Sequence, residues 1–246
     1  MPKEYFNICY EFDRQAVMRA IDNRVAERRP GYICVADGVI LDIANRDADY
    51  RQVIRNALFA ICDSSYVPLY IRMIHGEKYR QYCGSEIFRD VVSSTTHRMI
   101  FLGTKQAILD GLRQNLMSWN PAVESMTFHE LPFCTVDEFD YAGIARMIAD
   151  DGADIIWVAL GAPKQEHFMH RLEQHLDHGV MIAVGAAFKF YSGLDEKRAP
   201  EWMVRHHMEF LHRISQEPGK QMRRCFNIMR TLPGILWQEA RGKKKG

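Results

Sequence analysis

Two aspartates stand directly after short apolar runs of this 246-residue chain. Asp37 follows residues 32–36 and Asp63 follows residues 59–62, and each run has the length and the composition of a buried strand. A carboxylate at the end of such a strand can act as a general base that accepts a proton from an attacking hydroxyl. Aspartate also caps turns and helices, so each residue has a structural alternative.

A second polar cluster lies where the apolar run 153–160 gives way to a helical pattern. Gly161-Ala162-Pro163 forms the expected turn, and Lys164, Gln165 and Glu166 open the expected helix. Free N–H groups at a helix N-terminus favour an anion, so this cluster is a candidate for binding phosphate or hydroxyl groups. The alternative is a plain turn followed by a solvated helix start.

Other polar pairs are weaker candidates. Asp47 and Asp49 have the Asp-x-Asp spacing with which metal-dependent sugar transferases hold a divalent ion, but their place at an expected helix start favours capping. His206 and His207 are neighbours on an expected helix and would point in different directions, which favours a structural or surface role. The six cysteines contain no C-x-x-C pair, and fingerprints of dinucleotide, P-loop, metalloprotease and serine hydrolase sites are absent.

Apolar runs alternate with helical patterns along the chain, and the runs end repeatedly in Gly or Asp. We expect strands within residues 32–36, 59–62, 98–104, 125–128, 153–160 and 180–185. We expect helices within residues 13–29, 39–56, 105–119 and 140–150, and from residue 164 onward. This alternation predicts an α/β fold in which a mostly parallel sheet carries helices on both faces.

Charge is distributed unevenly between two predicted domains, residues 1–196 and 197–246. The second contains twelve Lys and Arg and four Glu, a net charge of +8, which leaves −7 for the first within a total of +1. A basic tail suggests a polyanionic partner, either anionic lipid or nucleic acid. We expect this tail to be helical and to be divided by Pro218 and Pro233. No run approaches a membrane span and the N-terminus lacks a signal-peptide layout, so a cytosolic protein is expected.

Four segments closely resemble the WecG/TagA/CpsF glycosyltransferases: residues 152–166, 184–190, 197–203 and 209–218. The resemblance implies a Rossmann-like α/β domain with a C-terminal helical appendage. It implies an inverting enzyme that moves a sugar, often N-acetylmannosamine or its uronic acid, from a UDP-sugar donor to an undecaprenyl-diphosphate-linked sugar. It further implies that the enzyme needs no metal or other cofactor and acts on the anionic inner face of the bacterial membrane. No nucleic acid partner is expected.

The resemblance also implies roles for individual residues. Asp63 matches the catalytic aspartate of the family and is therefore the expected general base. The residues expected to bind substrate are Asp37, Arg80, Gly103, Thr104, Gly161, Lys164, Gln165, Glu166, Gly185, Phe188, Arg198, Arg205, Arg213 and Arg224. Among these, the amides of the glycine turns and the tail arginines are expected to meet the charge of the diphosphate. The chain departs from the family pattern at Val35, Gln81 and Lys189.

Two functions of other classes remain open at the level of the sequence. One is a different Rossmann-like enzyme that uses a nucleotide cofactor, such as a methyltransferase. The other is a non-catalytic protein that binds nucleic acid through its basic tail. The sequence also leaves a homo-oligomer open.

Overall fold

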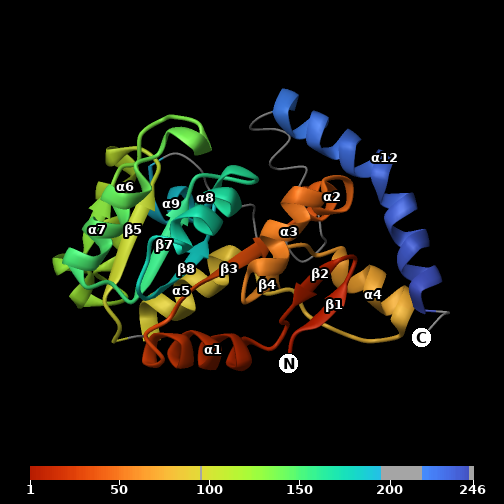
Figure 1. Cartoon of the computed structure of the whole chain (residues 1–246), viewed down its shortest axis with the longest axis horizontal. Coiled ribbons are helices and arrows are strands. Elements are labelled where there is room, and N and C mark those ends of the chain that lie inside the picture. Colours follow the sequence, from red (N-terminus) through yellow and green to blue (C-terminus); the bar gives the residue numbers. More distant parts are fainter. Residues whose placement is uncertain (95, 195–217, 244–246) are drawn as a thin grey trace.

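The computed structural model describes residues 1–94, 96–194 and 218–243 (Figure 1). An eight-stranded sheet has the strand order β1-β2-β4-β3-β8-β7-β5-β6. The strands are β1 (Lys3–Tyr5), β2 (Ile8–Tyr10), β3 (Pro30–Ala36), β4 (Phe59–Cys62), β5 (Met99–Gly103), β6 (Thr127–His129), β7 (Ile155–Ala159) and β8 (Gly179–Ala183). All neighbouring strands are parallel except the antiparallel pair β1–β2. The expected mostly parallel sheet is confirmed.

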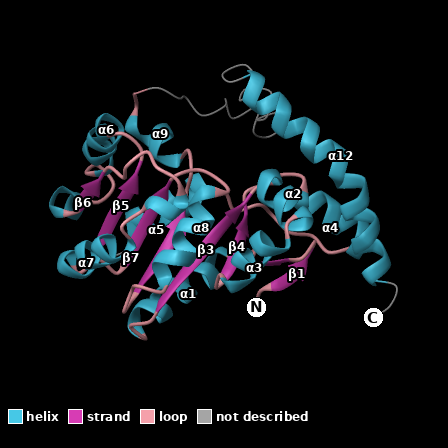
Figure 2. Cartoon of the chain, turned by 45° about the horizontal axis from the view of Figure 1, so that its top comes forward, coloured by secondary structure: helices cyan, strands magenta, loops and turns pink. Residues whose placement is uncertain are grey.

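Helices cover both faces of this sheet, as expected (Figure 2). One face packs against α2 (Gly38–Arg46), α3 (Ala48–Asn56), α4 (Val67–His75), α7 (Tyr141–Asp151) and α8 (Lys164–Glu173). The other packs against α1 (Arg14–Ala26), α5 (Gly84–Ser94), α6 (Gln106–Leu116) and α9 (Ala187–Ser192). Two short 3₁₀ helices are η1 (Pro121–Ser125) and η2 (Val136–Glu138). Alternate residues of β3 enter the two cores, Cys34 on one face and Ile33 and Val35 on the other.

The central strands are recognisable in the sequence because they are buried along their whole length. Every residue of β5, β7 and β8 is buried, as expected for parallel strands that are covered on both faces. Four helices, α1, α2, α3 and α7, begin at an aspartate that caps them. Asp47 accepts hydrogen bonds from the N–H groups of Asp49 and Tyr50 at 2.9 and 3.0 Å, so the capping interpretation of the Asp-x-Asp pair is confirmed.

Several elements differ from the expectation. The hairpin β1–β2 was not predicted, because three-residue strands are too short to show a period. The helix α4 lies in a stretch for which no element was predicted. The expected strand at 125–128 is shifted, since a 3₁₀ turn ends at Ser125 and β6 begins at Thr127.

The basic tail contributes one long helix, α12 (Pro218–Lys243), which lies along α2 and α4 (Figure 1). Pro218 starts this helix, but Pro233 lies inside it, so the expected division at Pro233 is wrong. Contacts on both sides of Pro233 explain the continuity: the Thr231 hydroxyl donates to Asp42, and Ile235 is buried in the core. No helix within the described ranges is long and apolar enough to cross a membrane. The predicted boundary at residues 196–197 falls outside these ranges and stays a prediction.

Candidate active site

The candidate residues gather at the carboxyl edge of the sheet. Asp37 follows β3, Asp63 follows β4, and the turn at residues 161–163 follows β7. The strands β4, β3, β8 and β7 are neighbours in that order, so these loops lie side by side. The chain leaves β3 toward α2 on one face and leaves β8 toward α9 on the other face. Ligands of open α/β sheets bind where neighbouring connections diverge in this way.

Asp63 is held at this edge through both its backbone and its side chain. Its N–H donates to the carbonyl oxygen of Ala36 at the end of β3, at 3.0 Å. Its Oδ1 accepts the N–H of Gly84, the first residue of α5, at 3.0 Å. The positive end of a helix dipole favours a negatively charged group, so this position suits a carboxylate. Asp63 is half-buried, as a base that must meet a substrate hydroxyl should be.

Asp37 caps α2. Its Oδ1 accepts the N–H groups of Val39 and Ile40 at 2.9 and 3.0 Å, which confirms the structural alternative for this residue. The cap also fixes the carboxylate beside the end of β3. Its expected contact with substrate stays a prediction.

Gln165 and Glu166 face inward, so the solvated helix start that we considered is wrong. Only 4% of Gln165 and none of Glu166 is exposed. Gln165 Oε1 accepts the N–H of Gly161 at 3.0 Å, and its Nε2 donates to Glu166 Oε1 at 2.8 Å. The hydroxyl of Tyr50, on α3, donates to Glu166 Oε2 at 3.1 Å. These bonds link the turn after β7 to α3 through a buried polar chain.

Burial raises the pKa of Glu166 from its usual 4.5 to about 7. The loss of solvation is the main cause, and the nearby Asp37 carboxylate also raises this pKa. The hydrogen bonds from Gln165 and Tyr50 act in the opposite direction, because they stabilise the ionised form. A carboxyl group with this pKa at a sheet edge is typical of functional sites.

The turns that were expected to offer free amides are partly occupied. The Gly161 N–H already binds Gln165, which corrects its expected role as a donor to the diphosphate. Near the turn after β5, the Gln106 N–H at the start of α6 binds Glu130 Oε2 at 2.7 Å. A carboxylate therefore already lies at this helix N-terminus.

Gly103 and Thr104 have a steric reason for the turn they form. Both have positive φ angles, 113° and 55°. A Cβ atom on Gly103 would lie 2.6 Å from the carbonyl oxygen of Ala159, so the close approach of β5 and β7 requires glycine here. Their expected contacts with substrate stay predictions.

Lys164 is tied to the loop before α7. Its Nζ donates to the carbonyl oxygen of Cys134 and lies 4.8 Å from the centroid of the Phe139 ring. The side chain is half-buried in this position. A cation beside the Gly161 turn suits an anionic ligand, and this role stays a prediction.

Phe188 and Gly185 follow β8 but differ in accessibility. The Phe188 ring is fully buried against Phe88 and Phe101, with centroids 5.6 and 6.0 Å apart, so its expected substrate contact is corrected to core packing. Gly185 has a φ of 49° and faces Gln165 Oε1. Arg80 is exposed on the approach to α5.

The tail reaches the same edge. The Ile228 Cδ1 atom of α12 lies 3.1 Å from the place where a Cβ atom on Gly38 would stand, directly after Asp37. Arg224 is half-buried one helical turn before Ile228 and lies on the same side of α12. The other expected tail arginines lie outside the described residues: Arg198, Arg205 and Arg213.

Tyr50, Gly84 and Glu86 were not among the site residues predicted from the sequence. Tyr50 is indistinguishable from an ordinary core residue of an amphipathic helix. A signal for the other two did exist, since Cys83 and Glu86 have the spacing of a capping box at the start of α5. Within the described ranges, His, Cys, Asp and Glu side chains form no group of three or more that could hold a metal ion.

Comparison with known families assigns the chain to one group of enzymes. The family model described as "Glycosyl transferase WecG/TagA/CpsF family" matches residues 8–245. The chain belongs to this family. The expected WecG/TagA/CpsF assignment is thus confirmed, and with it the assignment as a glycosyltransferase.

Three relatives of this WecG/TagA/CpsF chain carry the name N-acetylglucosaminyldiphosphoundecaprenol N-acetyl-beta-D-mannosaminyltransferase. The protein of Bacillus subtilis (strain 168) is 27% identical over 205 residues, which cover 81% of this chain and 77% of the relative. The protein of Bacillus spizizenii (strain ATCC 23059 / NRRL B-14472 / W23) is 24% identical and covers 89% and 83%. That of Staphylococcus aureus (strain MW2) is 22% identical and covers 87% and 81%.

Proposed function

We propose that this chain transfers an N-acetylmannosamine-type sugar from a UDP-sugar to N-acetylglucosamine linked to undecaprenyl diphosphate. The observation that carries the proposal is the shared name of the three relatives, which the chain matches over 77–83% of their lengths. The product would be an intermediate of a bacterial cell-surface polysaccharide. The reaction would take place at the inner face of the plasma membrane, where we propose that the protein binds peripherally.

Asp63 is the proposed general base. The acceptor hydroxyl attacks the anomeric carbon from the face opposite UDP, so its oxygen forms the new glycosidic bond as the bond to UDP breaks. The hydroxyl proton passes to the Asp63 carboxylate. A well-placed general base contributes about 10²- to 10⁴-fold to such a step. The fixed position of Asp63 at the carboxyl edge, with Oδ1 bound to Gly84 N–H, supports this assignment.

The departing UDP carries negative charge that the protein must stabilise. Cations and preorganised amides placed where charge develops lower the barrier. Within the described part of the chain, the proposed contributors are Lys164 beside the Gly161 turn, Arg224 on α12 and the backbone at Gly185. Arg80 is a further candidate. We propose that these groups act without a metal ion, so that transfer persists in excess EDTA.

The outer side of α12 supports a membrane role. Four large side chains form an apolar strip with the spacing of one helical side, and each is 56–73% exposed: Met222, Phe226, Met229 and Trp237. Three flanking arginines lie along one margin of this strip at helical spacing: Arg223, Arg230 and Arg241. The Arg241 guanidinium lies 3.6 Å above the Trp237 ring. A basic amphipathic helix of this kind binds anionic membrane surfaces in their plane.

The proposal is tested by a donor and acceptor screen. The purified full-length chain is incubated with a series of UDP-sugars and a polyprenyl-diphosphate-linked N-acetylglucosamine analogue, with and without EDTA. Mass spectrometry should detect the added N-acetylhexosamine on the acceptor with UDP-N-acetylmannosamine. Parallel titrations with UDP, NAD and S-adenosylmethionine, and with DNA at two salt concentrations, separate the other two classes. Tight binding of NAD, S-adenosylmethionine or DNA without transfer would contradict the proposal.

A further inference from the structure

The start of α5 runs alongside the end of β4 and holds the catalytic edge in place. Tyr82 N–H donates to the carbonyl oxygen of Cys62 at 3.0 Å, and Gly84 N–H donates to Asp63 Oδ1 at 3.0 Å. These two bonds bind successive residues of the strand end. The position of the Asp63 carboxylate therefore depends on where α5 begins.

The fit at this helix start is close. A Cβ atom on Gly84 would lie 3.1 Å from Val35 Cγ1, at the end of β3, and 3.6 Å from the carbonyl oxygen of Val184, after β8. Interiors packed this closely transmit a shift rather than absorb it. A displacement of α5 along its axis would thus move the group that binds Asp63.

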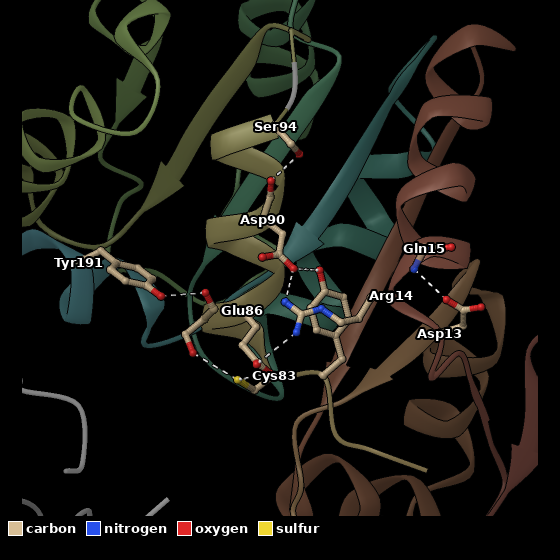
Figure 3. A network of polar contacts seen from close by, with 10 residues as sticks. Asp13, Arg14, Gln15, Cys83, Glu86, Asp90, Ser94 and Tyr191 are labelled. Carbon is tan, nitrogen blue, oxygen red and sulfur yellow. Dashed lines mark hydrogen bonds and ion pairs between the residues drawn. The ribbon is translucent and has the colours of Figure 1, made fainter. Parts of the chain in front are cut away.

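Glu86 fixes the first turn of α5 (Figure 3). Its Oε2 accepts the N–H of Cys83 at 3.1 Å and the Cys83 thiol at 3.1 Å. This is the reciprocal half of a capping box, in which the third residue of a helix binds the backbone N–H that precedes it. Cys83, whose N–H binds Glu86, directly precedes Gly84, whose N–H binds Asp63.

Arg14 clamps the same turn from α1 (Figure 3). Its Nη1 lies 3.6 Å from Glu86 Oε1, and its Nη2 donates to Asp90 Oδ2. The guanidinium carbon lies 4.6 Å from the centroid of the Tyr82 ring, and the Tyr82 hydroxyl also donates to Asp90 Oδ2, at 2.9 Å. One guanidinium thus contacts two carboxylates of α5 and the residue that binds Cys62.

Arg14 is itself anchored, because it is the first residue of α1. Asp13 caps α1 by accepting the N–H groups of Gln15 and Ala16 at 2.8 and 3.2 Å (Figure 3). On the other side of α5, the Tyr191 hydroxyl donates to the carbonyl oxygen of Ser85 at 2.9 Å. The helix start is therefore held from both sides.

We infer that Arg14 and Glu86 are positioning residues for Asp63: they hold the start of α5 so that Gly84 N–H fixes the carboxylate toward the acceptor hydroxyl. This inference rests on the proposed role of Asp63 as general base. Neither residue contacts the reacting groups. Their effect belongs to the proton-transfer step and not to the binding of donor or acceptor.

The test compares Arg14→Met and Glu86→Gln with the wild type in acceptor-dependent release of UDP. Arg14→Met keeps the length of the side chain but loses both ion pairs, and Glu86→Gln keeps an acceptor for Cys83 N–H while losing the charge that faces Arg14. We expect kcat to fall at least about tenfold, because small misplacements of a reacting group are costly, while KM for both substrates stays within about twofold. Arg14→Lys, which can reach one carboxylate, should recover part of the loss.

Arg98→Met is the matched control. Arg98 joins the amino edge of β5 to Asp151, with Nε 2.9 Å from Asp151 Oδ1 and Nη2 2.9 Å from Oδ2. This variant loses a comparable clamp at the opposite edge of the sheet. It should lower the melting temperature and leave kcat unchanged. An equal loss of kcat in Arg98→Met would mean that loss of stability alone explains the effect, and would overturn the inference.

A double-variant cycle separates this inference from the proposed function. In an Asp63→Asn background, Arg14→Met and Glu86→Gln should produce no further loss of turnover, since the group they position no longer accepts a proton. Normal turnover by Asp63→Asn alone would overturn the assignment of the base. Slow turnover by Asp63→Asn, with a full additional loss from Arg14→Met or Glu86→Gln, would leave the base in place and overturn the positioning role. If Arg14→Met does not fold, Glu86→Gln decides the question.

Discussion

Glu166 is the most constrained polar residue of the candidate site. It is fully buried, and the Tyr50 hydroxyl and the Gln165 amide donate hydrogen bonds to its carboxyl oxygens. Two donors suit the ionised form, whereas burial favours the neutral form. The result is a pKa of about 7, so this carboxyl changes charge close to neutral pH.

The first prediction concerns the pH dependence of stability in Glu166→Gln. The folded-state pKa of Glu166 is raised above its usual 4.5, so the folded protein binds more protons than the unfolded chain between pH 4.5 and about 7. The protonated Glu166 carboxyl stabilises the fold fully below pH 4.5, and this stabilisation is lost as the pH rises through about 7. Relative to Glu166→Gln, the wild type should lose up to about 3 kcal/mol of unfolding free energy across this range. Urea titrations at several pH values measure the unfolding free energy of both proteins. The same pH dependence for wild type and Glu166→Gln would contradict the prediction.

The second prediction concerns Gln165→Ala. The substitution removes the buried Gln165 partner of Gly161 N–H and of Glu166 Oε1, so we expect a loss of about 1–3 kcal/mol in unfolding free energy. We also expect transfer by the folded variant to fall at least about tenfold, because the turn beside the donor loses its support. Gln174→Ala, at the exposed end of the same helix, is the control and should change neither quantity. Normal turnover by the folded Gln165→Ala protein would make Gln165 purely structural.

At the residue scale, the sequence predicts which side chains lie at the carboxyl edge of the sheet better than it predicts whether they point inward or toward solvent. Asp37 and Asp63 are found because each ends an apolar run. The inward orientation of Gln165 and Glu166 is not found, because it depends on Tyr50, a partner 116 positions away from Glu166. The sequence pattern of α8 alone does not predict this contact.

At the scale of elements, α12 divides its surface between two environments. Its inner side binds the body through Thr231 and Asp42, through Ile235, and through Glu239, which accepts the N–H of Phe6 at 2.8 Å. A cavity of about 410 Å³ remains at this joint. The outer side carries the apolar strip and the flanking arginines. The inner side also places Ile228 close to Gly38 at the candidate site, so the basic apolar surface is on the side that faces away from it.

The third prediction concerns this outer side. The full-length chain should sediment with vesicles of phosphatidylglycerol and phosphatidylcholine, less at high salt, and weakly with phosphatidylcholine alone. Replacing the flanking arginines by Gln should weaken binding by roughly 100-fold, since each contributes about 1 kcal/mol near an anionic surface. Phe226→Ser with Trp237→Ser should weaken binding to both kinds of vesicle.

Phe133→Ser is the control for the apolar strip. Phe133 is fully exposed and lies in the loop before α7 rather than on α12. Its replacement should leave sedimentation unchanged. Equal and weak sedimentation of every variant at both salt concentrations would remove the membrane role of α12.

The continuous helix α12 and the hairpin β1–β2 were not predicted, because both depend on tertiary contacts. The helical pattern of the tail is visible, but Pro233 argues for a break that tertiary contacts of Thr231 and Ile235 override. The hairpin β1–β2 is stabilised by its place beside β4, which no local pattern of three residues encodes.

At the scale of the whole molecule, the alternation of buried strands and helices was enough to predict a mostly parallel sheet with two helical layers. The strand order was not predictable, because β8 lies between β3 and β7 through long-range packing rather than through adjacency in the chain. This order brings Asp63, Asp37 and the Gly161 turn to one edge.

The measurement that tests the central claim most directly compares wild type and Asp63→Asn under identical conditions. Acceptor-dependent release of UDP from UDP-N-acetylmannosamine is followed with the lipid-linked N-acetylglucosamine analogue, and UDP binding is measured in parallel. We predict that Asp63→Asn folds and binds UDP as the wild type does but turns over at least about 10²-fold more slowly, because an amide cannot accept the proton. Turnover of the folded Asp63→Asn protein at the wild-type rate, or no transfer by the wild type with any UDP-sugar, would contradict the account.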